Sequence, residues 1–252
     1  MIVATGVRKN YGSVRGVDDV HLTLRKGGVT SIIGPNGAGK SSLLALISRL
    51  SAMDAGTITV GGLDVTRTPS NVLAQRLAIL RQDNHLTARL TVRELVSFGR
   101  DPYSKGRLTV ADKGHIDAAL SYLGLTELAG RFLDELSGGQ RQRAFVALVL
   151  CQDTEYVLLD EPLNNLDMRH AAGMMKLLRR ASCELGKTVV VVLHDINFAS
   201  WYSDHIVAMR DGRVVRQGAP EQIITAEALR EIYDMEIKVR QVDGRPMALF
   251  YE

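Results

Sequence analysis

The sequence predicts a mixed α/β domain into which a helical segment is inserted. Short β-branched runs alternate with apolar residues at helical spacing, which is the pattern of an α/β fold. Val29–Ile33, Tyr156–Leu159 and Thr188–Leu193 are short runs typical of strands buried on both faces. From about Asn84 to Leu150 such runs disappear, and helical spacing replaces them. We therefore expect a helical subdomain within an α/β core.

The other elements follow from two periodicities, alternation for strands and the i, i+3, i+4, i+7 spacing for helices. Before the helical segment they are an edge strand at Val17–Leu24, a helix at Ser41–Leu50 and a strand with Ile58 and Val60. Within it, one helix carries Val92, Leu95 and Val96, and another carries Ile116, Ala119, Leu120 and Leu123. After it come a helix through Met174, Leu177 and Leu178, short strands that begin near Ile206, and a helix at Ala226–Tyr233.

The composition is that of a soluble globular protein, with 46% apolar and 23% charged residues. This argues against disorder and against a membrane-spanning chain, which needs about 20 consecutive apolar residues. The N-terminus shows no secretory signal pattern, and the two cysteines, Cys151 and Cys183, are expected to be reduced thiols. The net charge of +3 is spread along the chain, so we expect no nucleic-acid partner.

The segment Gly34–Ser41 (GPNGAGKS) fits the pattern G-x-x-x-x-G-K-[ST]. It follows a predicted strand and opens a predicted helix, which disfavours the alternative of a glycine-rich turn that binds nothing. Glycines let backbone N–H groups approach phosphate oxygens, and the helix N-terminus adds positive charge. Lys40 is expected to reach the β- and γ-phosphates of ATP, and Ser41 to bind Mg²⁺. The predicted contacts are Gly34, Pro35, Asn36, Gly37, Ala38, Gly39, Lys40, Ser41 and Ser42.

An acidic pair follows the predicted strand Tyr156–Leu159. Asp160 is expected to hold Mg²⁺ beside the phosphate-binding loop Gly34–Ser41 (the P-loop). Glu161 is expected to polarise the water that attacks the nucleotide. Alone, an apolar run that ends in Asp-Glu is as often an ordinary acidic turn. Downstream of a P-loop, it supports nucleotide hydrolysis.

A second anion-binding helix N-terminus is predicted at Leu136–Gln140 (LSGGQ). Ser137 is a good N-cap, and the two glycines expose backbone N–H groups at the start of a helix. The predicted contacts are Ser137, Gly138, Gly139 and Gln140. One nucleotide needs only one such helix from its own chain, which leaves the second free for another nucleotide.

Taken together, these motifs resemble the ATP-binding subunit of an ABC (ATP-binding cassette) transporter, in the family's order and over nearly the whole chain. The resemblance implies one domain, residues 1–252: a P-loop NTPase (RecA-like) core with an N-terminal antiparallel β subdomain (1–83 and 151–252) and an inserted α-helical subdomain (84–150) that carries LSGGQ.

Four more positions acquire roles from this resemblance. Tyr11 matches the aromatic residue that stacks on adenine, although a tyrosine that packs at a strand end is an alternative. Gln82 matches the glutamine that senses Mg²⁺ and the attacking water, and Asp167 matches the loop that crosses between subunits. His194 matches the histidine that contacts the γ-phosphate, although a histidine after a strand is often structural.

The resemblance also implies a mechanism and partners. Two chains would face head to tail, with each ATP between the P-loop of one and the LSGGQ of the other. Motion would pass to separate transmembrane permease subunits at the cytoplasmic face of the membrane, and indirectly to a substrate-binding protein. Phe98–Tyr103 (FGRDPY) resembles a segment of iron-chelate, haem and cobalamin importers. The stretch Phe98–Arg107 (FGRDPYSKGR), and Arg100–Arg107 within it, is a candidate docking surface for the permease, although a polar loop with no partner is an alternative.

Glu161–Met168 (EPLNNLDM) departs from the commoner EPTSALD pattern and resembles ATPases of ferric-siderophore importers, particularly for catecholate-type chelates. We therefore expect a ferric-siderophore importer. The alternatives are a haem, cobalamin or other metal-chelate importer, an exporter, and an ABC ATPase of translation or DNA repair. The last class usually carries two cassettes or a long coiled coil, and neither pattern occurs in this sequence.

Overall fold

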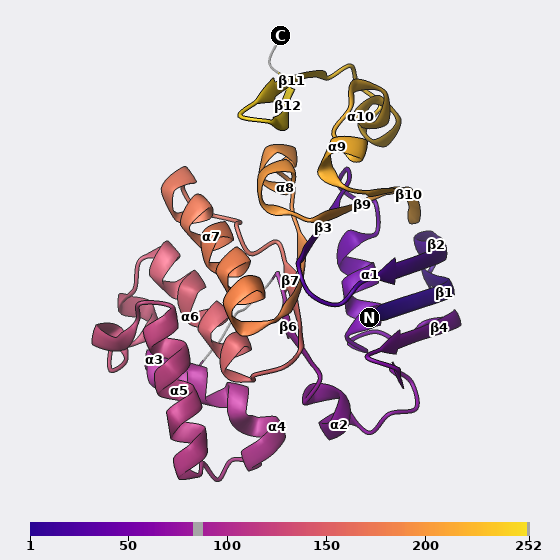
Figure 1. Ribbon diagram of the computed structural model, residues 1–252. Coiled ribbons are helices and arrows are strands. Elements are labelled where there is room, and N and C mark those ends of the chain that lie inside the picture. The colour runs from indigo at the N-terminus through magenta and orange to yellow at the C-terminus, as the bar shows by residue number, and fades with distance from the viewer. Residues whose placement is uncertain (83–87, 251–252) are drawn as a thin grey trace.

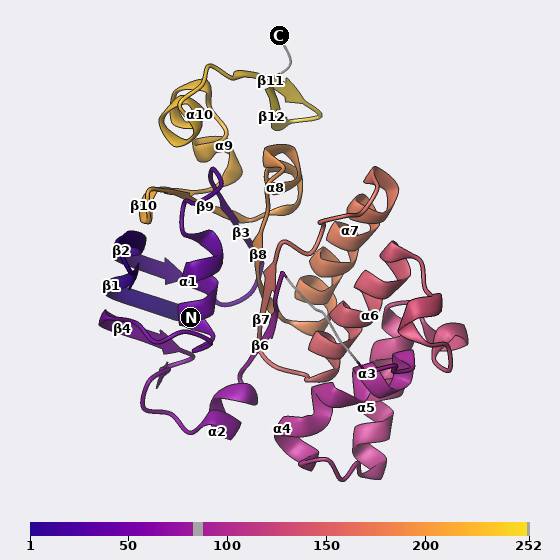
Figure 2. The same cartoon turned by 180° about the vertical axis from the view of Figure 1, so that it is seen from behind.

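The computed structural model describes residues 1–82 and 88–250. Figure 1 shows three parts: an antiparallel sheet in indigo, a central sheet, and a group of helices in magenta on the far side of that sheet. Figure 2 shows the same arrangement from behind, with the C-terminal elements beyond one end of the central sheet. The predicted α/β fold with a helical insert is confirmed.

The central sheet has six strands in the order β10-β9-β3-β8-β7-β6. All neighbours are parallel except β10, which pairs antiparallel with β9. The strands are β3 (Val29–Ile33), β6 (Leu77–Leu80), β7 (Tyr156–Asp160), β8 (Thr188–Val192), β9 (His205–Arg210) and β10 (Arg213–Gly218). This order places the ends of β3, β8 and β7 side by side.

Alternate residues of the central strands enter two different cores, because successive strand side chains point to opposite faces. Val189 and Val191 of β8 pack in the core shared with the helical insert, α7 (Met168–Leu185) and α8 (Ile196–Tyr202). Val190 and Val192 pack on the other face, with α1 (Lys40–Ile47) and the antiparallel sheet. A strand covered on both faces has no polar side, which explains its continuous apolar sequence.

The antiparallel sheet has the order β2-β1-β4-β5. Its strands are β1 (Ile2–Tyr11), β2 (Val14–Leu24), β4 (Ala55–Val60) and β5 (Leu63–Asp64). As predicted for Val17–Leu24, β2 lies at an edge and buries alternate residues. The helix α1 lies between the two sheets, so the predicted P-loop belongs to both layers.

The helical insert occupies the chain between β6 and β7. It contains α3 (Val92–Ser97), α4 (Asp101–Ser104), α5 (Val110–Tyr122), α6 (Gly138–Cys151) and three 3₁₀ helices, η1 (Phe98–Arg100), η2 (Thr126–Leu128) and η3 (Leu133–Glu135). The predicted apolar faces of α3 and α5 are buried. The predicted starting point, Asn84, lies outside the described residues, and the division of the chain at 83 and 151 stays a prediction.

Some details differ from the sequence-based expectations. The helix predicted at Ser41–Leu50 ends at Ile47, because Arg49 turns to a positive φ of 57° and donates to the carbonyls of Val65 and Thr68. Several short elements had no prediction, among them the edge strand β6 and the helix α8. The remaining short helices and hairpin are α2 (Ser70–Ala74), α9 (Pro220–Ile223), α10 (Ala226–Tyr233), β11 (Lys238–Val242) and β12 (Arg245–Leu249).

Within the described parts of the chain, no helix combines the length and the apolar character that crossing a membrane requires.

Candidate functional site

The glycine-rich loop joins the end of β3 at Ile33 to the start of α1 at Lys40. Lys40 turns back into the loop, where its ammonium donates to the carbonyl oxygens of Gly34 at 2.8 Å and Pro35 at 2.9 Å. Burial lowers the pKa of Lys40, and the nearby carboxylates of Glu161 and Asp160 oppose that shift. The loop therefore presents a cation and the N-terminus of a helix to the same space, as phosphate binding requires.

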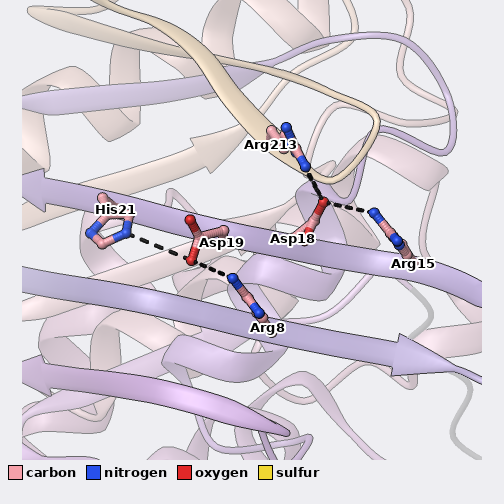
Figure 3. A network of polar contacts seen from close by, with 6 residues as sticks. All are labelled: Arg8, Arg15, Asp18, Asp19, His21 and Arg213. Atoms are coloured by element: carbon pink, nitrogen blue, oxygen red, sulfur yellow. Dashed lines mark hydrogen bonds and ion pairs between the residues drawn. The ribbon is translucent and has the colours of Figure 1, made fainter.

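The turn between β9 and β10 holds this loop in place. The Gly212 N–H donates to the carbonyl of Ala38 at 3.1 Å, and the carbonyl of Gly212 accepts from Asp18 N–H at 2.8 Å. Figure 3 shows that Arg213 reaches across to the Asp18 carboxylate, which also pairs with Arg15. Hydrogen bonding from Arg213 lowers the pKa of Asp18. Sequence reasoning missed this anchor because Asp18 and Arg213 lie 195 positions apart.

The acidic pair lies at the end of β7, next to α1. Ser41 Oγ donates to Asp160 Oδ1 at 2.9 Å, so the two predicted Mg²⁺ ligands are in contact. Burial raises the pKa of Asp160, while the Ser41 hydrogen bond lowers it and the adjacent Glu161 raises it further. A hydroxyl beside a carboxylate is an oxygen donor set that suits Mg²⁺.

Glu161 adopts a left-handed backbone conformation, with φ of 51°. Residues other than glycine rarely adopt this backbone conformation, and such backbone strain is concentrated at functional sites. Its carboxylate is nearly buried and meets His194 Nε2 at 2.7 Å through Oε1. His194 follows β8, the neighbour of β7, so the sheet order brings these two predicted catalytic residues together.

A cleft of about 490 Å³ gathers most of the predicted site. It is lined by Tyr11, Val14, Arg15, Gly16, Asn36, Gly37, Ala38, Gly39, Lys40, Ser41, Ser42, Gln82, Glu161 and His194. Tyr11 and Gln82 are exposed within it, at the ends of β1 and just after β6. The adjoining hollow, which adds Asp160, also contains Tyr11, Ser41 and Gln82. Arg15 and Gly16 were not predicted as site residues.

The LSGGQ segment lies elsewhere on the chain. Ser137 caps α6 by accepting from Gln140 N–H at 3.3 Å, as predicted, and Gln140 Oε1 accepts from Ser137 N–H at 3.0 Å. Gly139 packs against the ring of His170, where a Cβ would lie 2.7 Å from Cδ2. Neither Ser137–Gln140 nor Asp167 lines the cleft of the P-loop, so among the described residues the predicted nucleotide contacts fall into two separate groups.

Asp167 lies next to the LSGGQ group and begins α7. Its carboxylate accepts from both the backbone N–H and Nδ1 of His170, each at 2.8 Å. These hydrogen bonds lower the pKa of Asp167, the backbone bond most. Asp167 and Gly139 thus share His170 as a neighbour, a residue that no sequence motif pointed to.

The expectation that Arg100 belongs to a docking surface is wrong. Arg100 is only 5% exposed, because its guanidinium is paired with Asp112 at 2.9 Å and donates to the Cys151 carbonyl. Asp112 also accepts from Thr109, and these hydrogen bonds lower its pKa to about 2. Arg100 therefore joins η1, α5 and α6 inside the insert.

The comparison with known families decides what this arrangement is. A family model described as ABC transporter matches residues 17–164, which contain the P-loop, LSGGQ and the acidic pair. The chain belongs to the ABC transporter family. Both the resemblance seen in the sequence and the expected fold are therefore confirmed, and the cleft is that of an ABC-type ATPase.

Two relatives of this ABC ATPase match it over nearly the full length of both chains. It is 51% identical over 251 residues to the petrobactin import ATP-binding protein YclP of Bacillus subtilis, covering 100% of both chains. It is 51% identical over 250 residues to the petrobactin import ATP-binding protein FatE of Bacillus anthracis, and the match covers 99% of this chain and 100% of FatE.

A solved structure agrees with the fold. This is a dimeric post-hydrolysis state of an ATP-binding cassette bound to ADP and Pi, with 29% identity and a TM-score of 0.77. The similarity covers 87% of this chain and 98% of that chain.

Proposed function

We propose that this chain is the ATP-binding subunit of a ferric-siderophore importer and hydrolyses ATP as a head-to-tail dimer. One observation carries the dimer: the P-loop cleft and the LSGGQ group lie apart on the same chain. Each nucleotide would therefore be completed by the LSGGQ of a second copy. The full-length similarity to two petrobactin import ATP-binding proteins supports the cargo class.

In this proposal the P-loop amides and Lys40 bind the phosphates of ATP. Ser41 and Asp160 would hold Mg²⁺, with Gln82 nearby, and the ion would neutralise charge on the transferred phosphoryl group. Glu161 polarises the attacking water by accepting its proton, while His194 orients the Glu161 carboxylate and faces the γ-phosphate. Tyr11 supplies the flat surface for adenine at the open end of the cleft.

From the partner chain, Ser137, Gly138, Gly139 and Gln140 would donate to the γ-phosphate. Their position at the N-terminus of α6 suits an anion, because helix N–H groups and the helix dipole point at it. Asp167 would mark the border between the two chains. Bound ATP would then hold the two chains together, and its hydrolysis would let them separate.

The partners in the membrane would be transmembrane permease subunits, contacted from the cytoplasmic face, with a substrate-binding protein on the opposite side. The docking surface we propose is the exposed apolar face of the insert around α4. It consists of Phe98, Tyr103, Leu108 and Val110, together with Val72 of the adjoining α2. Gln75 Nε2 donates to the Pro102 carbonyl at 3.0 Å and fixes α2 against α4.

The dimer is tested with Glu161→Gln, which should bind ATP and stall hydrolysis. Size-exclusion chromatography with ATP should then show a dimer that dissolves when ATP is removed. Adding Ser137→Arg should prevent the dimer while ATP binding to the P-loop, measured by calorimetry, persists. A Glu161→Gln variant that turns over at the wild-type rate would refute the role of Glu161.

The cargo is tested in cells that lack this gene by uptake of ferric petrobactin or haem labelled with iron-55, and of cobalamin labelled with radioactive cobalt. Loss of ferric-petrobactin uptake, restored by the wild-type chain and not by Lys40→Ala, is the expected result. Loss of haem or cobalamin uptake with ferric-siderophore uptake intact would instead assign the chain to one of the other chelate importers.

A further inference from the structure

The segment Glu161–Asp167 departs from the commoner EPTSALD pattern, and Asn164 stands where that pattern has serine. Asn164 closes a turn that begins at Glu161, because its backbone N–H donates to the Glu161 carbonyl at 3.2 Å. Its side chain adds a second contact, in which Nδ2 donates to Glu161 Oε2. The backbone bond already holds the turn, so the side-chain contact has a separate role.

The two oxygens of the Glu161 carboxylate have different partners. His194 Nε2 meets Oε1 at 2.7 Å, and Asn164 Nδ2 donates to Oε2. The Glu161 side chain is 8% exposed, whereas that of His194 is 42% exposed. Since the carboxylate has a partner on each side, it cannot rotate about its terminal bond without losing one of them. Each oxygen keeps a second lone pair with which to accept from a water molecule.

We propose that Asn164 is a positioning residue for ATP hydrolysis, which fixes the plane of the Glu161 carboxylate toward the attacking water. This inference rests on the role proposed above for Glu161. A general base must lie within hydrogen-bond reach of the proton that it accepts, and small misplacements reduce the rate strongly. The glutamate's left-handed backbone, with φ of 51°, fixes one end of the side chain, and Asn164 with His194 fixes the other.

The position of Asn164 also links the carboxylate to the border between chains. The next residue, Asn165, has a left-handed φ of 62°, and its carbonyl lies 3.9 Å from where a Cβ on Gly138 would be. The loop therefore contacts the Glu161 carboxylate at Asn164 and lies beside Gly138 of the LSGGQ group at Asn165. A shift of this loop on dimer formation would be passed directly to Glu161.

The test compares steady-state ATP hydrolysis by wild type, Asn164→Ala, which removes the donor to Glu161 Oε2, and the near-isosteric Asn164→Asp, which replaces that donor by a carboxylate. Both variants should lose kcat by about tenfold to a hundredfold, while KM and the calorimetric Kd for ATP stay within about twofold. Asn71→Ala is the matched control, because Asn71 lies exposed in α2, away from the cleft. It should keep the wild-type kcat.

A double-mutant cycle shows whether Asn164 acts through Glu161. Single-turnover rates of Glu161→Gln with and without Asn164→Ala should be equal, because the orienting residue has nothing left to orient. If Asn164→Ala and Asn164→Asp hydrolyse ATP at the wild-type rate while Glu161→Gln is stalled, the inference fails and the proposed function stands. Parallel loss of ATP binding in both Asn164 variants would also overturn it. Wild-type turnover by Glu161→Gln would overturn both.

Discussion

Replacing Gly39 by alanine should destabilise this protein far more than the same change at Gly37, two residues away in the same loop. Both glycines have positive φ, 93° and 79°. At Gly39 a Cβ would lie 2.2 Å from the backbone oxygen of Gly16 and 3.3 Å from Gly212 Cα. At Gly37 nothing lies within 4 Å of that position. Comparing the two alanine variants therefore separates the cost of backbone strain, which both share, from the cost of steric overlap, which arises at Gly39.

The left-handed backbone costs an alanine roughly 1–2 kcal/mol at either position. At Gly39 the overlap is with backbone, which cannot rotate away as a side chain can. Overpacking of this kind costs about 1–3 kcal/mol more. For a domain of this size, a difference of about 2 kcal/mol lowers the melting temperature by roughly 4–8 °C.

Thermal unfolding followed by circular dichroism, in EDTA and without nucleotide, measures this difference directly. Gly39→Ala should melt roughly 4–8 °C below Gly37→Ala, which itself should melt slightly below wild type. Nucleotide is left out because Gly37 lines the cleft proposed to bind ATP, where a Cβ would change nucleotide affinity as well as stability. Equal melting temperatures for the two variants would refute the expected overlap between a Cβ on Gly39 and the backbone oxygen of Gly16.

Three further predictions concern other parts of the chain. Burial raises the pKa of Asp160 above its usual 3.8, so ionising this carboxyl destabilises the folded state as pH rises. Asp160→Asn should therefore melt above wild type in EDTA, by a margin that grows above about pH 4. A margin that stays constant with pH would contradict this. Gly139→Ala should lower the melting temperature because its Cβ would lie 2.7 Å from His170 Cδ2, and the loss should vanish when His170 is also alanine; additive losses would exclude the clash. Ellman's reagent should label Cys183 in the native protein and Cys151 only after unfolding, because Cys151 is buried with its pKa raised to about 12; two native equivalents would be inconsistent with that burial.

The parts of the fold that sequence reasoning predicted are those with a local physical signal. The strands β7 and β8 are buried on both faces, which leaves continuous apolar runs in the sequence. Ser137 was predicted as an N-cap because serine is a favoured cap residue at the start of a helix, and its hydroxyl accepts from Gln140 N–H as such a cap does. Such patterns need no knowledge of the tertiary structure.

The parts that were missed depend on contacts between distant segments. The strand β6 (LAIL) is too short to distinguish from a helical turn and gains its identity from pairing with β7. Arg100 looks like a surface residue in sequence, and only the distant Cys151 carbonyl and Asp112 show that it is buried. The anchor between Asp18 and Arg213 spans most of the chain and has no local pattern.

The placement of the helical insert has a consequence for how this protein can vary. The strands β6 and β7 are parallel neighbours, and parallel neighbours require a connection that carries the chain back to the start of the next strand. The insert is that connection, and α6 is its returning leg, since Val146 and Ala147 share a core with Val157. A shortened cassette made by joining β6 directly to β7 would reverse the second strand. The part of the insert that precedes α6 can therefore change in length while β6 and β7 stay parallel.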